Sequence, residues 1–139
     1  MKELSIYCDG GSRGNPGPSA GGFVVLNKGK VIHEDYMYLG IGTNNFAEYS
    51  SVVNALKWLI EENKKKEIKK VKIHLDSLLV VNQLMGKYKI KSKNLIPLAG
   101  FCKKIQKLFT GEISYVYVPR SDNKYADNLV NIALDENTP

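Results

Sequence analysis

The stretch from which the fold can be predicted reads IYCDGGSRGNPGP, residues 6–18. It completes an alternating segment, residues 3–9, that predicts a β-strand ending in Asp9. Beyond it, residues 10–22 hold six glycines and two prolines, a composition that predicts a loop. An acid at the end of a strand, followed by a flexible loop, is a typical place for a site in a protein built on a sheet.

Outward from this stretch, apolar periodicity and breaker residues divide the rest of the chain into strands and helices. Strands are predicted at 23–27, 31–39, 71–75 and 112–118, and helices at 45–63, 77–85, 95–109 and 123–134. Three sequential strands joined by short connections favour an antiparallel meander, whereas the two later strands need crossovers. This order predicts an α/β fold with a five-stranded mixed sheet flanked by helices.

Composition limits the possible classes of protein. A chain of 139 residues with 43% hydrophobic residues is expected to form a single domain over 1–139, with no separate amino-terminal domain. No apolar run approaches the ~18–20 residues of a membrane span, so no membrane association is expected. Two cysteines, Cys8 and Cys102, fit a reducing compartment, so we expect a cytoplasmic protein. The net charge of +6 favours a polyanionic partner without identifying it.

Four acids lie where a site is expected. Asp9 and Asp76 end predicted strands, and Glu48 and Asp127 lie in the first turns of predicted helices. Local structure can explain three of them singly, because Glu48 could close a capping box with Asn45, Asp76 could cap a helix, and Asp127 could face solvent. Together, three or four converging carboxylates are the ligand set that Mg²⁺ prefers, and a pair of ions ~3.5–4 Å apart promotes phosphoryl transfer.

Four spaced blocks carry a resemblance to a known family: residues 6–18, TNNFAEY at 43–49, LDS at 75–77 and NKYAD at 123–127. In this order they closely resemble the type 1 ribonuclease H family. The resemblance implies the ribonuclease H-like fold, with three antiparallel and then two parallel strands. It also implies an endoribonuclease that hydrolyses the RNA strand of RNA–DNA hybrids and leaves 5′-phosphate and 3′-hydroxyl ends. Asp9, Glu48, Asp76 and Asp127 match the family's metal-binding acids, for two Mg²⁺ ions or Mn²⁺ as a substitute.

The same matching predicts residues that bind the substrate. The glycine-rich segment would lie along the RNA minor groove, where 2′-hydroxyls distinguish RNA from DNA. Thr43 and Asn44, which precede the helix that carries Glu48, would bind a DNA phosphate at its N-terminus. The predicted substrate contacts are Gly10, Gly11, Ser12, Arg13, Asn15, Thr43, Asn44, Asn45, Ser77, Asn94 and Arg120. One departure is the segment 118–123, which is short and lacks the histidine that many relatives carry; there Arg120 could bind a phosphate instead.

Other functions remain open at this stage. One is a non-catalytic module of the same fold that binds hybrid or duplex nucleic acid, although a binder gains nothing from a repulsive acidic cluster. Another is an exonuclease or an integrase-like enzyme that cuts DNA, which the glycine-rich segment and the TNN block disfavour. Double-stranded RNA is a further candidate partner beside the RNA–DNA hybrid, and nothing in the sequence argues against a monomer.

Overall fold

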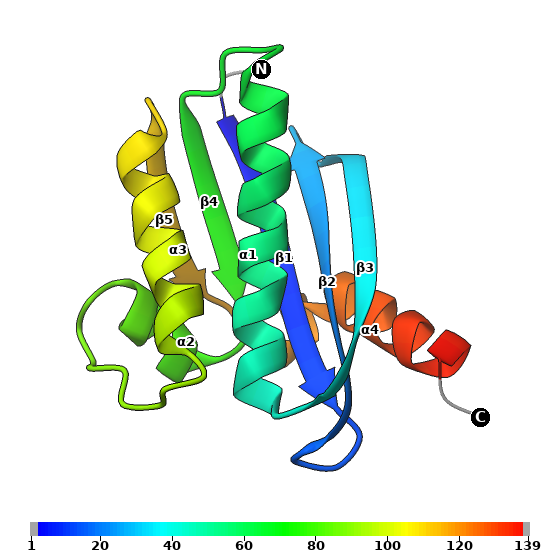
Figure 1. Cartoon of the computed structure of the whole chain (residues 1–139). Coiled ribbons are helices and arrows are strands. Elements are labelled where there is room, and N and C mark those ends of the chain that lie inside the picture. The colour runs from blue at the N-terminus through cyan, green and yellow to red at the C-terminus, as the bar shows by residue number, and fades with distance from the viewer. Residues whose placement is uncertain (1–2, 138–139) are drawn as a thin grey trace.

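A five-stranded sheet with helices on both faces forms the framework of the protein (Figure 1). The computed structural model describes residues 3–137. Its strands are β1 (Glu3–Ser12), β2 (Gly17–Asn27), β3 (Lys30–Gly42), β4 (Lys70–Leu75) and β5 (Glu112–Tyr117). Its helices are α1 (Asn44–Asn63), α2 (Leu78–Leu84), α3 (Ile96–Leu108) and α4 (Lys124–Asn137), with a short 3₁₀ turn, η1, at Arg120–Asp122. Every predicted strand and helix is present, in the predicted order.

The strands lie in the order β3-β2-β1-β4-β5. The β2 strand pairs antiparallel with both β1 and β3, whereas β4 pairs parallel with β1 and with β5. The prediction of a mixed sheet with three antiparallel and two parallel strands is therefore confirmed. Because β1 and β4 are parallel neighbours, the residues that follow their carboxyl ends are brought to the same edge of the sheet.

Two apolar cores hold the layers together. The larger core joins the sheet to α1, α2 and α3, and its fully buried side chains include Ile6, Leu56 and Ile73. The smaller core joins β2 to α4 through Ala20, Val130, Ala133 and Leu134. The first and last elements of the described chain are therefore fixed to each other through the sheet, on the face opposite α1 (Figure 1).

The prediction that residues 10–22 form a loop is wrong. The β1 strand continues to Ser12 and β2 begins at Gly17, so that only a short turn separates them. The glycines here permit close packing of helices on the sheet. A Cβ atom on Gly10 would lie 2.2 Å from the backbone carbon of Ala47 in α1, and one on Gly22 would lie 2.8 Å from Leu129 Cβ in α4.

The predicted cap of the first long helix is also wrong. Thr43, not Asn45, is the N-cap of α1, and its hydroxyl accepts a hydrogen bond from the Phe46 N–H at 3.1 Å. Glu48 is therefore not the third residue after the cap, as a capping box requires. Ser77 caps α2 through its side chain, which frees Asp76 from that role.

Two further expectations from the sequence concern membrane-spanning segments and the two cysteines. In the part of the chain that the structure describes, no helix has the length and apolar character needed to cross a bilayer. Cys8 and Cys102 are both buried and both free thiols.

Candidate functional site

Three carboxylates converge where β1 and β4 end. Asp9 belongs to the last part of β1, Asp76 follows β4 directly, and Glu48 reaches toward them from the second turn of α1. One carboxylate oxygen from each residue lies within 4.8 Å of the others, which makes this triad a candidate metal centre. Asp127, from the first turn of α4, lies outside the triad and lines the same cleft.

Glu48 is the most enclosed member of the triad. Its carboxylate is buried, and Oε1 accepts a hydrogen bond from the Gly10 N–H at 3.3 Å. The other oxygen, Oε2, is buried and has no partner among the described residues. A buried carboxylate oxygen without a donor is costly, and a cation would remove that cost. The donor set of three hard oxygens also fits a divalent ion such as Mg²⁺.

Crowding of the acids changes their protonation. Burial raises the pKa of Asp9 to about 7, the charges of Asp76 and Asp127 add to the rise, and the neighbouring Glu48 side chain opposes it. Burial also raises the pKa of Glu48 well above its ordinary value, and the charge of Asp9 adds to this rise. Without a metal, Asp9 is therefore partly protonated near neutral pH, and a bound cation would displace its proton.

The wall of the cleft is held by side-chain hydrogen bonds between the β1–β2 hairpin and the start of α1. Asn44 Oδ1 accepts hydrogen bonds from the Ser12 N–H and hydroxyl, at 2.9 and 3.2 Å. The Asn44 N–H donates to Asn15 Oδ1 at 3.0 Å. These polar residues therefore have a structural role in joining the hairpin to the helix that carries Glu48.

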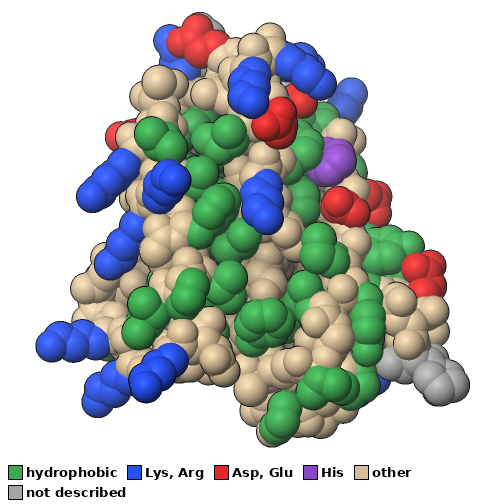
Figure 2. All heavy atoms as spheres, viewed as in Figure 1, with side chains coloured by type: hydrophobic (Ala, Val, Ile, Leu, Met, Phe, Trp, Pro, Cys, Tyr) green, Lys and Arg blue, Asp and Glu red, His purple; other side chains and the backbone are tan. Residues whose placement is uncertain are grey.

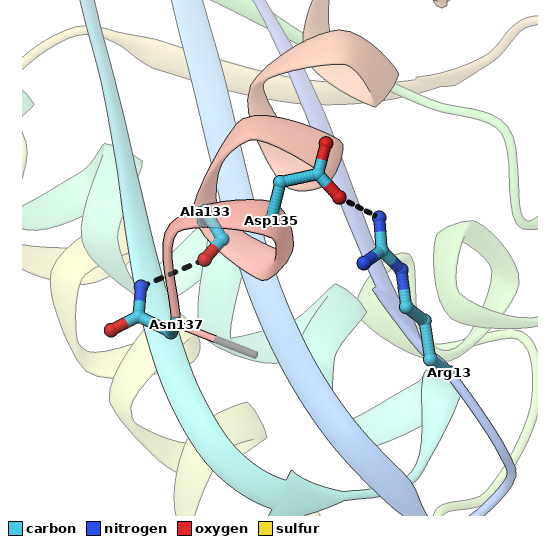
Figure 3. A network of polar contacts seen from close by, with 4 residues as sticks. All are labelled: Arg13, Ala133, Asp135 and Asn137. Atoms are coloured by element: carbon cyan, nitrogen blue, oxygen red, sulfur yellow. Dashed lines mark hydrogen bonds and ion pairs between the residues drawn. The ribbon is translucent and has the colours of Figure 1, made fainter. Parts of the chain in front are cut away.

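The tip of the same hairpin is tied to the last helix. Arg13 extends across to Asp135, and the Nη2–Oδ1 distance is 2.6 Å (Figure 3). In the last turn of α4, the Asn137 side-chain amide donates to the Ala133 carbonyl at 2.7 Å. Both partners of the ion pair are solvent-exposed, so the contact contributes little to stability, and Arg13 is within reach of a ligand in the cleft.

The structure brings most of the predicted site residues into one cleft of about 470 Å³. Its lining includes all four acids together with Gly10, Gly11, Ser12, Arg13, Asn44, Asn45, Ser77 and Arg120. Three predicted contacts do not line it, namely Asn15, Thr43 and Asn94. A larger hollow of about 650 Å³, at the start of β1, is lined by a single acid and has no carboxylate cluster.

Several residues of the site were not singled out in the sequence. Val130, Asn131 and Leu134 line the cleft from α4, one and two turns beyond Asp127, where helical spacing could have indicated them. Asn123 is 1% exposed and donates a hydrogen bond to Asp76. It stands in the same NKYAD block as Asp127, which was the available signal.

Positive charge gathers on one part of the molecule. Residues 77–111 contain seven lysines and no acidic residue, and they form α2, α3 and the connection between them. Figure 2 shows blue side chains along this side, whereas acidic side chains lie mainly elsewhere on the same face. A basic lobe on a molecule with an acidic cleft suits a polyanionic ligand whose contact with the protein extends beyond the cleft.

Comparisons with known proteins agree with this geometry. Residues 7–133 match a family model described as reverse transcriptase-like. The chain is 38% identical over 135 residues to a bifunctional protein of Mycobacterium tuberculosis, a match covering 96% of this chain and 36% of the relative. It is 31% identical over 152 residues to a ribonuclease H of Clostridium botulinum, with 98% of each chain covered. The crystal structure of LC11-RNase H1 in complex with RNA/DNA hybrid superposes with a TM-score of 0.91 at 37% identity, covering 96% of this chain and 97% of that one.

The sheet order and the acidic triad at its edge define a protein of the ribonuclease H-like fold. Because the matches extend over nearly the whole chain, this protein belongs to the type 1 ribonuclease H family. It spans about a third of the length of the mycobacterial relatives, at 36% of each.

Proposed function

We propose that this chain is a metal-dependent endoribonuclease that hydrolyses the RNA strand of RNA–DNA hybrids, leaving 5′-phosphate and 3′-hydroxyl ends. The observation that carries the proposal is the triad of Asp9, Glu48 and Asp76, with the unpartnered Oε2 of Glu48 beside it. Membership of the type 1 ribonuclease H family supports it, as does the 37% identity to a protein solved with a bound RNA/DNA hybrid.

The triad would hold the metal, and Asp127 would complete the ligand set from α4. When bound, two Mg²⁺ ions, or Mn²⁺ in their place, supply Lewis-acid stabilisation of the phosphoryl oxygens and activation of water. The protein contributes the placement of the ligands. Gly10 fixes one oxygen of Glu48 through its N–H, and the closeness of α1 to β1 at Gly10 sets how far Glu48 reaches into the cleft.

The hairpin and the helix termini would bind the hybrid. An A-like duplex exposes its 2′-hydroxyls in a wide, shallow minor groove, where small residues allow the backbone to approach. Gly11, Ser12 and Asn45 line the cleft in a position to make such contacts. Arg13 and Arg120 would bind phosphates at its edges, and Thr43 would present the N-terminus of α1 to a DNA phosphate. Asn15 would act indirectly, by orienting Asn44.

We assign the lysine-rich lobe to the nucleic acid as well, with Asn94 in its α2–α3 connection as a further phosphate contact. Phosphate contacts carry most of the affinity and little sequence information, so binding should be strong at low salt and broad in sequence. We propose that the active form is a monomer.

A cleavage assay tests the proposal. One labelled RNA sequence is presented as an RNA–DNA hybrid, as a single strand and as an RNA duplex, with Mg²⁺ or Mn²⁺. Asp9→Asn and Asp76→Asn are compared with the parent protein and with Asp122→Asn, which removes an exposed acid that does not line the cleft.

The expected result is cleavage of the hybrid by the parent and by Asp122→Asn, with at least a thousandfold loss in the two triad variants. Cleavage of the RNA duplex as well would widen the substrate class to double-stranded RNA. Tight binding of the hybrid with no cleavage under either metal would overturn the proposal and favour a non-catalytic binding module.

A further inference from the structure

Asn123 connects three of the four acidic positions of the cleft. Its side-chain Nδ2 donates to the Cys8 carbonyl at 2.8 Å and to Asp76 Oδ2 at 3.2 Å. Its own carbonyl accepts the Asp127 N–H at 3.1 Å, which is the first helical bond of α4. Cys8 directly precedes Asp9 in β1. One residue thus links the end of β1, the end of β4 and the start of α4.

The orientation of the Asn123 amide follows from its partners. Both the Cys8 carbonyl and the Asp76 carboxylate are acceptors, so the NH₂ group must face them, and both of its hydrogens are used. The amide oxygen, Oδ1, is then directed elsewhere; it is buried and has no partner among the described residues. An unpaired buried acceptor costs free energy. An apolar side chain of similar size could fill the same space without this cost, so space filling alone does not explain an asparagine here.

The hydrogen bond from Asn123 opposes repulsion within the triad. Asp76 lies close to Asp9 and Glu48, and the three carboxylates repel one another when ionised. Among the hydrogen bonds of the described residues, Asn123 is the donor to the Asp76 side chain. Because the same NH₂ group is fixed to the backbone of β1, it ties the Asp76 carboxylate to the strand that carries Asp9.

We infer that Asn123 is a positioning residue, which holds Asp76 at the separation from Asp9 that a divalent cation requires. Asn123 is 1% exposed, so it does not contact substrate itself. Its effect reaches the ligand through Asp76, and in metal sites the loss of such an outer hydrogen bond typically reduces metal affinity or activity ~10–100-fold. The inference rests on the proposed metal site but does not require that the hybrid be cleaved.

The test measures Mn²⁺ affinity by titration calorimetry on the full chain without nucleic acid. Asn123→Ala removes the donor and leaves space, whereas Asn123→Leu removes the donor and fills the space. Asn128→Ala is the matched control, because Asn128 is an exposed asparagine on the same helix that does not line the cleft. Thermal unfolding of each variant is measured in EDTA, and the titrations are carried out at a temperature at which every variant is folded. Hybrid affinity is measured in EDTA by fluorescence anisotropy.

Both Asn123 variants should bind Mn²⁺ at least ~tenfold more weakly than the parent, while Asn128→Ala stays within twofold. Hybrid affinity in EDTA should stay within twofold for all, because no substrate contact is lost. Parent-like Mn²⁺ affinity in Asn123→Leu would show a space-filling role and overturn the inference. An equal loss of hybrid affinity in EDTA would indicate general distortion of the cleft and would also overturn it.

A measurement on the parent protein remains decisive where the variants do not fold. The Asn123 side-chain amide resonances should shift on addition of Mg²⁺ with the same midpoint as the Asp9 backbone amide, because the Asp76 carboxylate to which they donate changes its charge environment. Absence of that shift would overturn the inference. A parent that binds metal with this response but does not cleave the hybrid would overturn the proposed function alone.

Discussion

Replacing Asp9 with asparagine should stabilise the metal-free protein while abolishing its activity. In the folded chain the pKa of Asp9 is raised to about 7 from an ordinary value of 3.8, chiefly by burial. The carboxylate is therefore more costly in the folded state than in the unfolded state. The substitution keeps the shape of the side chain and removes the charge.

The size of the effect follows from linkage. A difference of 7 − 3.8 = 3.2 pKa units corresponds to roughly 4 kcal/mol, at 1.36 kcal/mol per unit. Because the folded state binds the proton more tightly, this destabilisation is absent below pH 3.8, grows as pH rises and is complete above pH 7. The expected gain for Asp9→Asn at pH 8 is therefore about 4 kcal/mol.

Urea unfolding followed by circular dichroism, in EDTA, measures this gain. At pH 8 the Asp9→Asn variant should unfold at a higher urea concentration than the parent, and at pH 4.5 the gain should fall to about 1 kcal/mol or less. Asp122→Asn, the same substitution at an exposed position, should change the free energy of unfolding by less than about 0.5 kcal/mol at either pH.

Two results would refute the reasoning. A variant no more stable than the parent at pH 8 would mean that the folded protein does not raise the pKa of Asp9. A gain of equal size at pH 4.5 and pH 8 would mean that the stabilisation does not come from ionisation.

Three further predictions concern the same region. Gly10→Ala should destabilise the protein by more than about 3 kcal/mol in urea unfolding, because the new Cβ would lie 2.2 Å from the Ala47 backbone, whereas the same change at the open Gly100 should be nearly neutral or mildly stabilising. Asn44→Ala should lower hybrid affinity by roughly fivefold in anisotropy titrations, about 1 kcal/mol, because Ser12 in the hairpin loses both of its hydrogen bonds to the Asn44 side chain; unchanged affinity would exclude that role. Mg²⁺ binding at pH 6.5 should release about one proton per chain, seen by calorimetry in buffers of different ionisation enthalpy, and Asp9→Asn should greatly reduce this release.

The element order and the acidic positions could be predicted because both depend on local patterns. Alternating and 3.6-residue periodicities locate the strands and helices, and Asp9 and Asp76 are marked by strands that end in them. The prediction of the family and of the five-stranded mixed sheet is confirmed. That Asp9, Glu48 and Asp76 meet within 4.8 Å required the parallel pairing of β1 with β4, which no local pattern reports.

The errors have a common physical cause. In the sequence, Gly10, Gly17 and Gly22 resemble loop residues, but in the structure they lie in strands. Glycine is needed at these positions because neighbouring backbone or a helix packs too closely to leave room for a Cβ atom. Thr43 and Asn45 are both acceptable caps by residue type, and only the path of the chain after β3 selects Thr43. Asn123 was missed because its importance lies in contacts with Cys8 and Asp76, which are distant in the sequence.

The hydrogen bond between Asn123, at the start of α4, and Cys8 in β1 has a consequence for synthesis of the protein. Asp9 is synthesised before Asn123 and Asp127, which lie at the start of α4. A nascent chain that ends after β5 therefore contains Asp9, Glu48 and Asp76 but lacks Asn123, whose amide links Asp76 to β1. It also lacks α4, which lines part of the cleft. A chain arrested before α4 is therefore expected to bind metal more weakly than a chain that includes α4.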